Sequence, residues 1–286
     1  MTEHLHEPSR VMIVDGMSVL KTTAGGTAFL TNGYAYNFFT QLTATLKKFP
    51  DIKGVFVVWE GGYDRRSKIY PDYKNTRKPN TQEVRDQRKL VQDLLELLGV
   101  EQVHAEGYEG DDMGAWLVHN LGSKALLYSN DQDWLQLVGP GVSIYQKSAY
   151  SEGKKFSRVE ITREKFEHYT GWPSPEMYLR AKCLMGDKDE VPGIAGIGAA
   201  TSRSFLLGLD VSVTRREKLE AFIASPQFEI NMKLGDLRTP QPEIVPIWRH
   251  GQPSEEKSLQ WLHDIKWPSL VKVFPAWWEV YKRAQV

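Results

Sequence analysis

Three short apolar runs in the first half of the chain each end at an acidic residue. The runs read VMIVD at residues 11–15, GVFVVWE at 54–60 and ALLYSND at 125–131. Short runs rich in β-branched and aromatic residues and closed by turn formers are typical of buried strands. Weaker runs near 101–104 and 142–145 indicate two further strands.

Helical periodicity separates these strands. Apolar residues recur at helical spacing near residues 34–48, 81–98 and 111–121. Strands that alternate with helices predict an α/β fold with a mostly parallel, doubly wound sheet. From residue 162 onward the pattern is helical, and the tail from about 225 is rich in proline and tryptophan. We therefore expect an α/β core over residues 1–160 and a helical region over residues 161–286.

The carboxylates that follow the strands should lie close together. In an open parallel sheet, the carboxyl ends of the strands meet at one edge, where ligands bind. Acidic residues also begin the helix near 109–112 and recur near 187–189. The full set of candidate metal ligands is Asp15, Glu60, Glu109, Asp111, Asp112, Asp131, Asp133, Asp187 and Asp189. So many carboxylates at one edge would repel each other unless cations neutralise them.

The donor set indicates which metal would bind. Oxygen ligands without a matching histidine or cysteine cluster favour Mg²⁺ or Mn²⁺ over zinc. Two such ions about 4 Å apart can activate water and stabilise the leaving oxygen in phosphodiester hydrolysis. Each acid also has a simpler interpretation, as a turn former, a helix cap or a partner of the helix dipole. The recurrence of acids at four equivalent places favours a metal site.

Positive charge is concentrated in one stretch, although the chain has no net charge, with 36 Lys+Arg and 36 Asp+Glu. From Gly62 to Lys89, nine basic residues accompany four acidic ones, an excess of five. Beside an acidic metal site, this stretch can supply counter-charges to a phosphate backbone. Arg65, Arg66 and Lys68 are the candidates for DNA binding. The alternative is a solvated helix face.

A glycine-rich segment, PGIAGIG at residues 192–198, precedes helical sequence. Gly193, Gly196 and Gly198 allow close backbone approach, so amides at the next helix start could meet a phosphate. No Gly-Lys-Ser/Thr follows and no strand leads in, which argues against a Walker loop or a dinucleotide fingerprint. A helix–turn–helix over about 178–208 that grips duplex backbone fits better, with a helix-breaking loop as the alternative.

Cysteine content and hydropathy indicate a compartment. Cys183 is the only cysteine, which excludes an intrachain disulfide and a thiol-based zinc site. No stretch approaches the roughly 18 apolar residues of a membrane span, and MTEHLHEPSR lacks the apolar segment of a signal peptide. We expect a monomer without membrane contact, in the cytoplasm of a bacterium or of a phage-infected host.

Five segments in order resemble the 5′-nuclease superfamily of flap endonucleases and 5′–3′ exonucleases, in its compact phage and bacterial form. They are VMIVDG (11–16), YPDYKNTR (70–77), GYEGDDMGAW (107–116), SNDQDW (129–134) and MGDKDEVPGIAGIG (185–198). Each segment alone is a weak signal, but five in the family's order are specific. The tail beyond about residue 225 carries little of the match.

This resemblance implies a PIN-like nuclease core with a helical arch, over about 62–98, that admits single-stranded 5′ DNA. It also implies a helix–turn–helix that binds duplex DNA and often a monovalent cation such as K⁺. The residues that match metal-site positions are Asp15, Glu109, Asp111, Asp112, Asp131, Asp133 and Asp189. Lys74 and Arg77 match basic arch residues that contact the scissile phosphate, and Tyr73 matches a stacking platform for a base.

Three positions depart from the family pattern. Glu60 stands where the family usually has aspartate, so its longer side chain would reach a metal differently or through water. The segment Asp187–Asp189 is one residue shorter than the usual pair of aspartates. Ala200 occupies the position of a lysine after the glycine-rich turn, and Arg203 could offset that loss.

Three functional hypotheses follow. The leading one is an Mg²⁺-dependent, structure-selective 5′ nuclease in replication or repair, acting on DNA with 5′ ends or 5′ flaps, or on an RNA–DNA hybrid. A PIN-type ribonuclease shares the acidic α/β site, but such domains are shorter and lack the glycine-rich helical extension. A non-catalytic flap or junction DNA-binding protein is the third, motivated by the shortened Asp187–Asp189 segment. Nearly all the acids remain, which argues against it.

Overall fold

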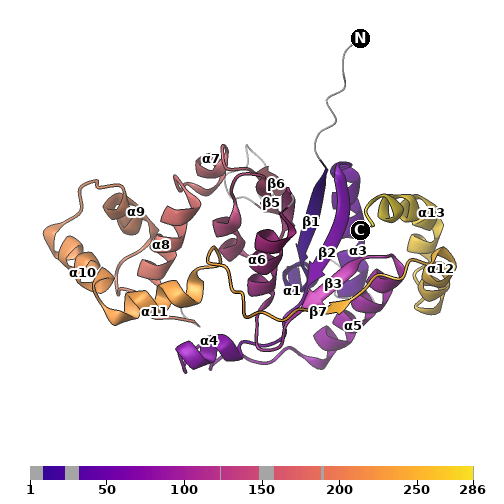
Figure 1. The fold of residues 1–286 in the computed structure, drawn as a ribbon, viewed down its shortest axis with the longest axis horizontal. Helices are drawn as coiled ribbons and strands as arrows, with labels where there is room; N and C mark the ends of the chain where they lie inside the picture. The colour runs from indigo at the N-terminus through magenta and orange to yellow at the C-terminus, as the bar shows by residue number, and fades with distance from the viewer. Residues whose placement is uncertain (1–8, 23–31, 123, 148–157, 188–189, 286) are drawn as a thin grey trace, which may run out of the picture.

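The computed structural model describes residues 9–22, 32–122, 124–147, 158–187 and 190–285 (Figure 1). Within these residues, seven strands form one sheet in the order β6-β5-β4-β1-β2-β3-β7. The strands are β1 (Arg10–Asp15), β2 (Ile52–Val58), β3 (Glu101–His104), β4 (Ala125–Tyr128), β5 (Val142–Lys147), β6 (Arg158–Ile161) and β7 (Ile247–Arg249). Strands β1 to β5 run parallel, whereas β6 and β7 are antiparallel edge strands. The expected mostly parallel sheet is confirmed.

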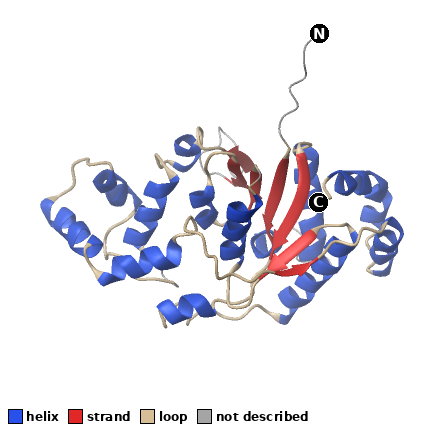
Figure 2. Ribbon diagram, viewed as in Figure 1, coloured by secondary structure: helices blue, strands red, loops and turns tan. Residues whose placement is uncertain are grey.

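Helices cover both faces of the sheet (Figure 2). One face carries α1 (Gly16–Thr22), α3 (Gly33–Lys48), α5 (Gln82–Leu97), α12 (Glu255–Asp264) and α13 (Pro268–Arg283). The other carries α6 (Gly110–Leu121), the 3-10 helix η1 (Gln132–Leu137), α7 (Phe166–Thr170) and α8 (Pro175–Met185). The helices of the first face enclose a first core with the sheet, and those of the other face enclose a second core. Because side chains alternate along a strand, Met12 and Val14 of β1 pack in the first core and Ile13 packs in the second.

A helical extension lies beyond α8 (Figure 1). It consists of α9 (Ala199–Leu206), α10 (Val213–Ile223) and α11 (Pro226–Gly235). These helices enclose a small core of Leu184, Ile197 and Leu219. The short helix α4 (Asp64–Ile69), which follows β2, contacts α11. The extension therefore reaches the edge of the sheet where the parallel strands end.

Local sequence explains where two of these helices begin. Thr81 and Ser174 accept a hydrogen bond from a backbone N–H of the first turn, that of Val84 and Met177 respectively. Pro175 occupies the first turn of α8, where no backbone N–H is needed. These caps determine the residues at which α5 and α8 begin.

The arch predicted over about 62–98 covers α4, α5 and the residues between them. Within it, α5 buries Val91, Leu94 and Leu95 in the first core. Helix α5 is amphipathic, and its apolar face packs against neighbouring helices and is not exposed to solvent. The part of the predicted arch that lies outside the core layers is therefore residues 62–81.

The tryptophan-rich tail returns to the first half of the chain. Strand β7 pairs with β3, and α13 packs on α3. Trp267, Trp277 and Trp278 are buried in the first core, so the tail packs onto the core of the sheet. The apolar side chains of the tail complete a core that begins before the predicted boundary at residue 160.

The predicted helix–turn–helix over 178–208 coincides with α8, a loop and α9. A Cβ added to Gly193 would lie 2.0 Å from the carbonyl oxygen of Met185, so this loop folds back tightly on the end of α8. DNA binding by these helices stays a prediction. Among the helices of the described residues, none is long and apolar enough to cross a membrane.

Gly114→Ala is expected to destabilise the fold by about 1–3 kcal/mol. An added Cβ would lie 2.4 Å from the ring of Trp134, which is fully buried and hydrogen-bonded to Asp111. Urea unfolding followed by circular dichroism measures the free energy of unfolding. Gly139→Ala is the matched control, because the nearest atom lies 3.9 Å away. Equal stability of the two variants would show that Trp134 shifts at no cost.

Candidate active site

The acidic residues that follow β1, β2 and β4 line one hollow at the edge of the sheet. Asp15 pairs in register with Val58, and Val14 pairs with Tyr128. The residues after these strands therefore lie side by side. The hollow has a volume of about 300 Å³, and its acidic lining residues are Asp15, Glu60, Glu109, Asp111 and Asp131. Its basic lining residues are Lys21, Lys74 and Arg77.

Asp15 is a buried carboxylate held by two donors. Its Oδ1 accepts a hydrogen bond from the backbone N–H of Ser18 at 2.9 Å, and its Oδ2 accepts one from the hydroxyl of Ser129 at 2.7 Å. Burial raises the pKa of Asp15 to about 7 against these hydrogen bonds, and the charges of Asp131 and Glu60 add to the rise. Asp15 thus experiences the negative charge of two other acids.

Asp111, at the start of α6, is enclosed in the same way. Its Oδ1 accepts a hydrogen bond from the indole N–H of Trp134 at 2.6 Å. Burial, followed by the charges of Asp131 and Asp15, raises the pKa of Asp111 well above its usual range. The acids of this hollow therefore repel each other, and their oxygen donors suit a divalent ion such as Mg²⁺ or Mn²⁺.

The carboxylates do not form a closed cage. In the part of the chain that the structure describes, no three carboxylate, imidazole or thiol groups converge as a ready-made metal site. Several of the oxygens are held by hydroxyl, indole or cationic donors instead. The fit to a divalent ion rests on the donor chemistry and on the repulsion that a bound cation would relieve.

Glu109 is the centre of a buried ionic network. Its Oε1 accepts a hydrogen bond from Nζ of Lys74 at 2.6 Å. Its Oε2 accepts hydrogen bonds from Nη1 of Arg66 at 2.6 Å and from the hydroxyl of Tyr73 at 2.7 Å. Arg66 also contacts Oδ1 of Asp112 through Nη2 at 2.9 Å. Both oxygens of Glu109 are therefore occupied by side-chain donors in this conformation.

The structure places Tyr73 and Lys74 in the interior, with exposed fractions of 2% and 5%. Lys74 has a left-handed backbone, with φ 53°, and its ammonium also lies 2.8 Å from Oε1 of Glu190. Burial lowers the pKa of Lys74, but the charge of Glu109, with Tyr73 and Glu190, outweighs it and holds the pKa above its usual value. Arg77, in contrast, is exposed at the rim of the hollow.

The three basic residues of α4 predicted to bind DNA have different surroundings. Arg66 is buried between Glu109 and Asp112. Arg65 lies 3.7 Å from a carboxylate oxygen of Glu243. Lys68 is exposed. The structure therefore gives Arg66 an internal role, in which it holds the acids at the start of α6, and leaves Lys68 on the surface.

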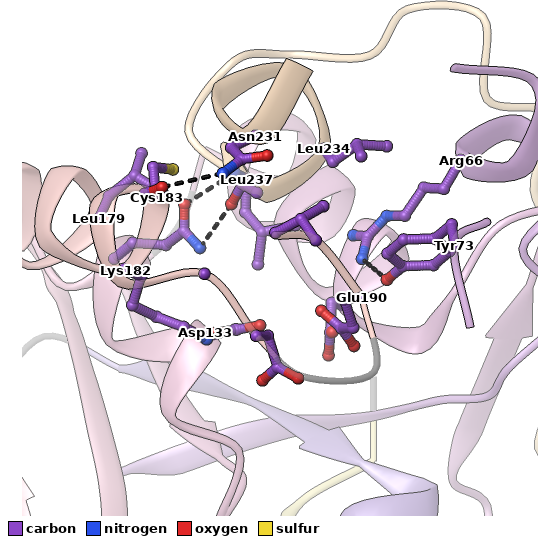
Figure 3. A pocket seen from close by; sticks show the side chains of 16 residues that line it. Arg66, Tyr73, Asp133, Leu179, Lys182, Cys183, Glu190, Asn231, Leu234 and Leu237 are labelled. Carbon is purple, nitrogen blue, oxygen red and sulfur yellow. Dashed lines mark hydrogen bonds and ion pairs between the residues drawn. The ribbon is translucent and has the colours of Figure 1, made fainter. Parts of the chain in front are cut away.

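Two further acidic candidates line a neighbouring hollow, between α8, α11 and the 70–77 segment (Figure 3). Asp133 forms an ion pair with Lys182 there, and Asp187 lies in its wall. Figure 3 shows Arg66 and Tyr73 on one side of this hollow and Lys182 on the other. Asp111 lines both hollows, so they are adjacent. Asp189 lies outside the described residues.

The glycine-rich segment lies outside the acidic hollow. Gly193, Gly196 and Gly198 belong to the loop between α8 and α9, and none of them lines the acidic hollow. Gly196 is left-handed, with φ 78°. Arg203, on α9, lies 3.1 Å from a carboxylate oxygen of Glu167. Gly193 lines a further hollow together with Asp187, so the start of this loop lies beside the acidic segment after α8.

Sequence reasoning missed several residues beside the acidic hollow. Lys21, Tyr63, Lys78 and Arg88 line a groove that adjoins it. Lys78 and Arg88 belong to the basic stretch, so the charge of that stretch pointed to them. The sequence does not indicate which of its basic residues face the acids. Lys21 comes from α1, and nothing in its local sequence distinguishes it from an ordinary surface lysine.

Comparison with known proteins identifies the family. The family model of the 5′-3′ exonuclease N-terminal resolvase-like domain matches residues 10–170, which is more than half of the chain and includes the acids that follow β1, β2 and β4. The chain belongs to this 5′-3′ exonuclease family. The resemblance inferred from the five sequence segments is thereby confirmed.

Individual relatives include 5′-3′ exonucleases and DNA polymerases. The 5′-3′ exonuclease of Aquifex aeolicus is 30% identical over 194 residues, which cover 65% of this chain and 62% of that protein. A thermostable DNA polymerase I of Thermus filiformis is 27% identical over 291 residues, which cover 93% of this chain. The chain spans about a third of the length of such polymerases, with 33% covered.

Solved structures share the fold of this 5′-3′ exonuclease family member. The T5 D15 protein, co-crystallised with metal ions, has a TM-score of 0.66 at 18% identity and covers 95% of this chain and 99% of its own. The catalytic core of Rad2 in complex with DNA substrate has a TM-score of 0.59 at 19% identity, covering 94% and 92%. The whole arrangement of sheet and helical extension is therefore that of a known fold.

Without metal, the stability of this family member should decrease as pH rises. The folded pKa of Asp15 is about 7, against an ordinary value of 3.8. Between these values the folded state binds more protons than the unfolded state, so the free energy of unfolding falls as pH increases, by about 1.4 kcal/mol per pH unit at most. Urea unfolding in EDTA at several pH values measures this slope.

Asp15→Asn should reduce that slope, because asparagine cannot titrate, and the raised pKa of Asp111 accounts for the part that remains. Added Mg²⁺ should raise the stability of the unsubstituted protein most at the upper end of the range. Asp86→Asn, an exposed position on α5, is the control and should leave the slope unchanged. A stability that rises with pH in EDTA would contradict the assigned repulsion.

Proposed function

We propose that the protein is a structure-selective 5′ nuclease, a flap endonuclease and 5′–3′ exonuclease, that cleaves DNA in replication or repair. The observation that carries this proposal is the set of acids Asp15, Glu60, Asp111 and Asp131 in one hollow bordered by cationic side chains. The names of the relatives agree with it: one is a 5′-3′ exonuclease, and another was co-crystallised with metal ions.

Two divalent ions, Mg²⁺ or Mn²⁺, would bind at this edge of the sheet. Asp15 and Asp111 are favoured as ligands because burial and carboxylate repulsion raise their pKa values, and Asp131 is favoured because its charge contributes to that repulsion. Glu60 lines the same hollow. Asp133 lines the adjacent hollow, and Asp111 lines both. Two ions, when bound, activate the attacking water and stabilise the leaving oxygen. The segment Asp187–Asp189 would complete the second position.

Lys74 and Arg77 would supply positive charge to the reacting phosphate. Arg77 is exposed at the rim, so it can meet the substrate first. Lys74 is paired with Glu109 and Glu190. A phosphate oxygen would replace one of these carboxylates as its partner, which leaves the charge of the lysine balanced throughout. Tyr73 would stack on a base once this segment opens.

The substrate would extend from the acids in two directions. Residues 62–81 would admit the single-stranded 5′ end. The loop between α8 and α9, with Gly193, Gly196 and Gly198, would hold the duplex together with Arg203 of α9, and K⁺ would bind at the same loop. We propose DNA with 5′ ends or flaps as the substrate, and RNA–DNA hybrid as a second. The protein would act as a monomer in the cytoplasm of a bacterium or phage-infected host.

Cleavage of a 5′-labelled DNA flap, beside a matching blunt duplex and single strand, tests this proposal in Mg²⁺ and in EDTA. We expect cutting near the flap junction that requires the metal. Flap binding without cutting would favour a non-catalytic DNA-binding protein. Cutting of single-stranded RNA alone would favour a PIN-type ribonuclease.

A further inference from the structure

A basic groove adjoins the acidic hollow. It has a volume of about 280 Å³, and its lining includes Lys21, Tyr63, Arg77, Lys78 and Arg88. Lys21, Glu60, Arg77 and Glu109 line both the groove and the hollow, so the two are continuous. The cations come from three separate parts of the chain: α1, the 62–81 segment and α5. A ligand in this groove would therefore lie directly beside the acids.

The cations of the groove form no salt bridge with neighbouring acids. Among the described residues, this holds for Lys21, Arg77, Lys78 and Arg88, although Glu60 and Glu109 also line the groove and the charge of Glu60 acts on Arg88. Arg66 and Lys74, which lie nearby, each pair with two carboxylates. The contrast shows that the fold balances its inner cations with acids but leaves those of the groove without carboxylate partners.

Arg88 is a fixed cation at one wall of the groove. Its guanidinium lies 5.1 Å from the centre of the Trp59 ring, and its Nη2 donates to the backbone carbonyl of Glu60 at 3.2 Å. A guanidinium carries five N–H donors in a planar fork, so most of them remain for an anion. Because α5 is part of the core, this donor is held in place before any ligand arrives.

We propose that this groove binds a phosphate group of the substrate strand, with a 5′-terminal phosphate monoester as the preferred ligand. A monoester carries a charge of about −1.5 to −2 near neutral pH, whereas an internal phosphodiester carries a single negative charge. Four cations and two carboxylates, Glu60 and Glu109, line the groove, so positive charge is in excess by two, which favours the monoester. The ring of Tyr63, which is 38% exposed, offers a face for the adjoining base.

This inference rests on the proposed function, because it makes the groove a subsite of the nuclease. The acids and the groove are contiguous. A terminal phosphate held by Arg88 and Lys78 would therefore determine which phosphodiester bond of the strand lies over the acids. The groove would thereby determine how far from the 5′ end the strand is cut.

Binding of a short single-stranded deoxyoligonucleotide that carries either a 5′-phosphate or a 5′-hydroxyl tests the proposal. The strand has a 3′ fluorophore, and anisotropy is measured in EDTA. The unsubstituted protein should bind the phosphorylated strand about tenfold more tightly, the effect of one charge-assisted contact. Arg88→Gln and Lys78→Ala should each reduce this preference to about twofold or less, with little change for the hydroxyl strand.

Lys53→Ala is the matched control, because Lys53 is an exposed lysine at the opposite end of β2. It should keep the full preference. Equal affinity of the unsubstituted protein for the two strands would overturn the proposal, and so would an unchanged preference in both groove variants. A loss of affinity for both strands alike would assign the groove to internal phosphodiesters and overturn the terminal phosphate.

Circular dichroism of each variant separates a local effect from misfolding. Because this assay contains no metal and measures no cleavage, its result is independent of the flap-cleavage test. A protein that cuts flaps without preferring the phosphorylated strand would retain the proposed function and lose this inference. A protein that prefers the phosphorylated strand but cuts no flap would retain this inference and lose the proposed function.

Discussion

Replacing Asp111 and Asp131 together with asparagine should reduce metal-dependent cleavage by about a thousandfold or more, equivalent to about 4 kcal/mol of transition-state stabilisation. The two residues line the acidic hollow, and the charge of Asp131 is the largest carboxylate contribution to the raised pKa of Asp111. Asparagine keeps the shape of each side chain but removes the charge that attracts a divalent ion. Single-turnover cleavage of a 5′-labelled flap over a range of Mg²⁺ concentrations measures the effect.

The same double variant should be more stable than the unsubstituted protein in EDTA, because the repulsion in the hollow is relieved. It should also bind a flap in EDTA at least as tightly. Asp86→Asn on the exposed face of α5 is the control for a general loss of negative charge. A double variant that cleaves at the unsubstituted rate would remove these two acids from the metal site, and one that fails to fold would make them structural.

Lys74→Ala should slow single-turnover cleavage by about 100- to 1,000-fold. The ammonium of Lys74 is held in the interior between Glu109 and Glu190, at 2.6 and 2.8 Å. These contacts fix the position of the ammonium before substrate arrives, so Lys74 is a preorganised donor at the hollow. Its loss should lower the maximal rate more than the affinity for flap DNA.

Lys74→Arg should recover part of the rate, since it keeps the charge. Lys89→Ala, at an exposed position on α5 in the same basic stretch, should cleave normally. Melting temperatures of the three variants separate rate effects from loss of the Glu109 network. If Lys74→Ala cleaves like the Lys89→Ala control, the lysine serves the fold alone.

The order of strands and helices in the nuclease core follows from local sequence. The run VMIV at 11–14 is apolar at every position and is closed by a turn former, a pattern typical of a strand buried on both faces. Chain direction then adds a constraint that needs no coordinates. Parallel strands end at one edge, so the meeting of Asp15, Glu60 and Asp131 could be predicted from their positions after each strand.

The edge strands and the packing of α5 could not be predicted in this way. Strand β7 has three residues, too few to show a period, and it pairs with β3 although the two lie far apart in sequence. Helix α5 was recognisable as amphipathic, but the same pattern suits a surface helix of an arch and a helix of the core. Its apolar face is covered by α3 and α12, and that choice depends on where the tail returns.

Local periodicity and chain direction thus suffice for the sheet, the helices and the edge that gathers the acids, because each depends on neighbouring residues or on strand polarity. The partners of individual charges depend on long-range packing. Lys74 and Glu109 are separated by 35 residues, and Arg66 and Asp112 by 46. From local composition alone, Arg66, Tyr73 and Lys74 belong to a basic stretch that would be expected at the surface. Only the packing of α4 and the 70–77 segment against α6 decided that they are buried, because burial of a cation requires a carboxylate at hydrogen-bonding distance.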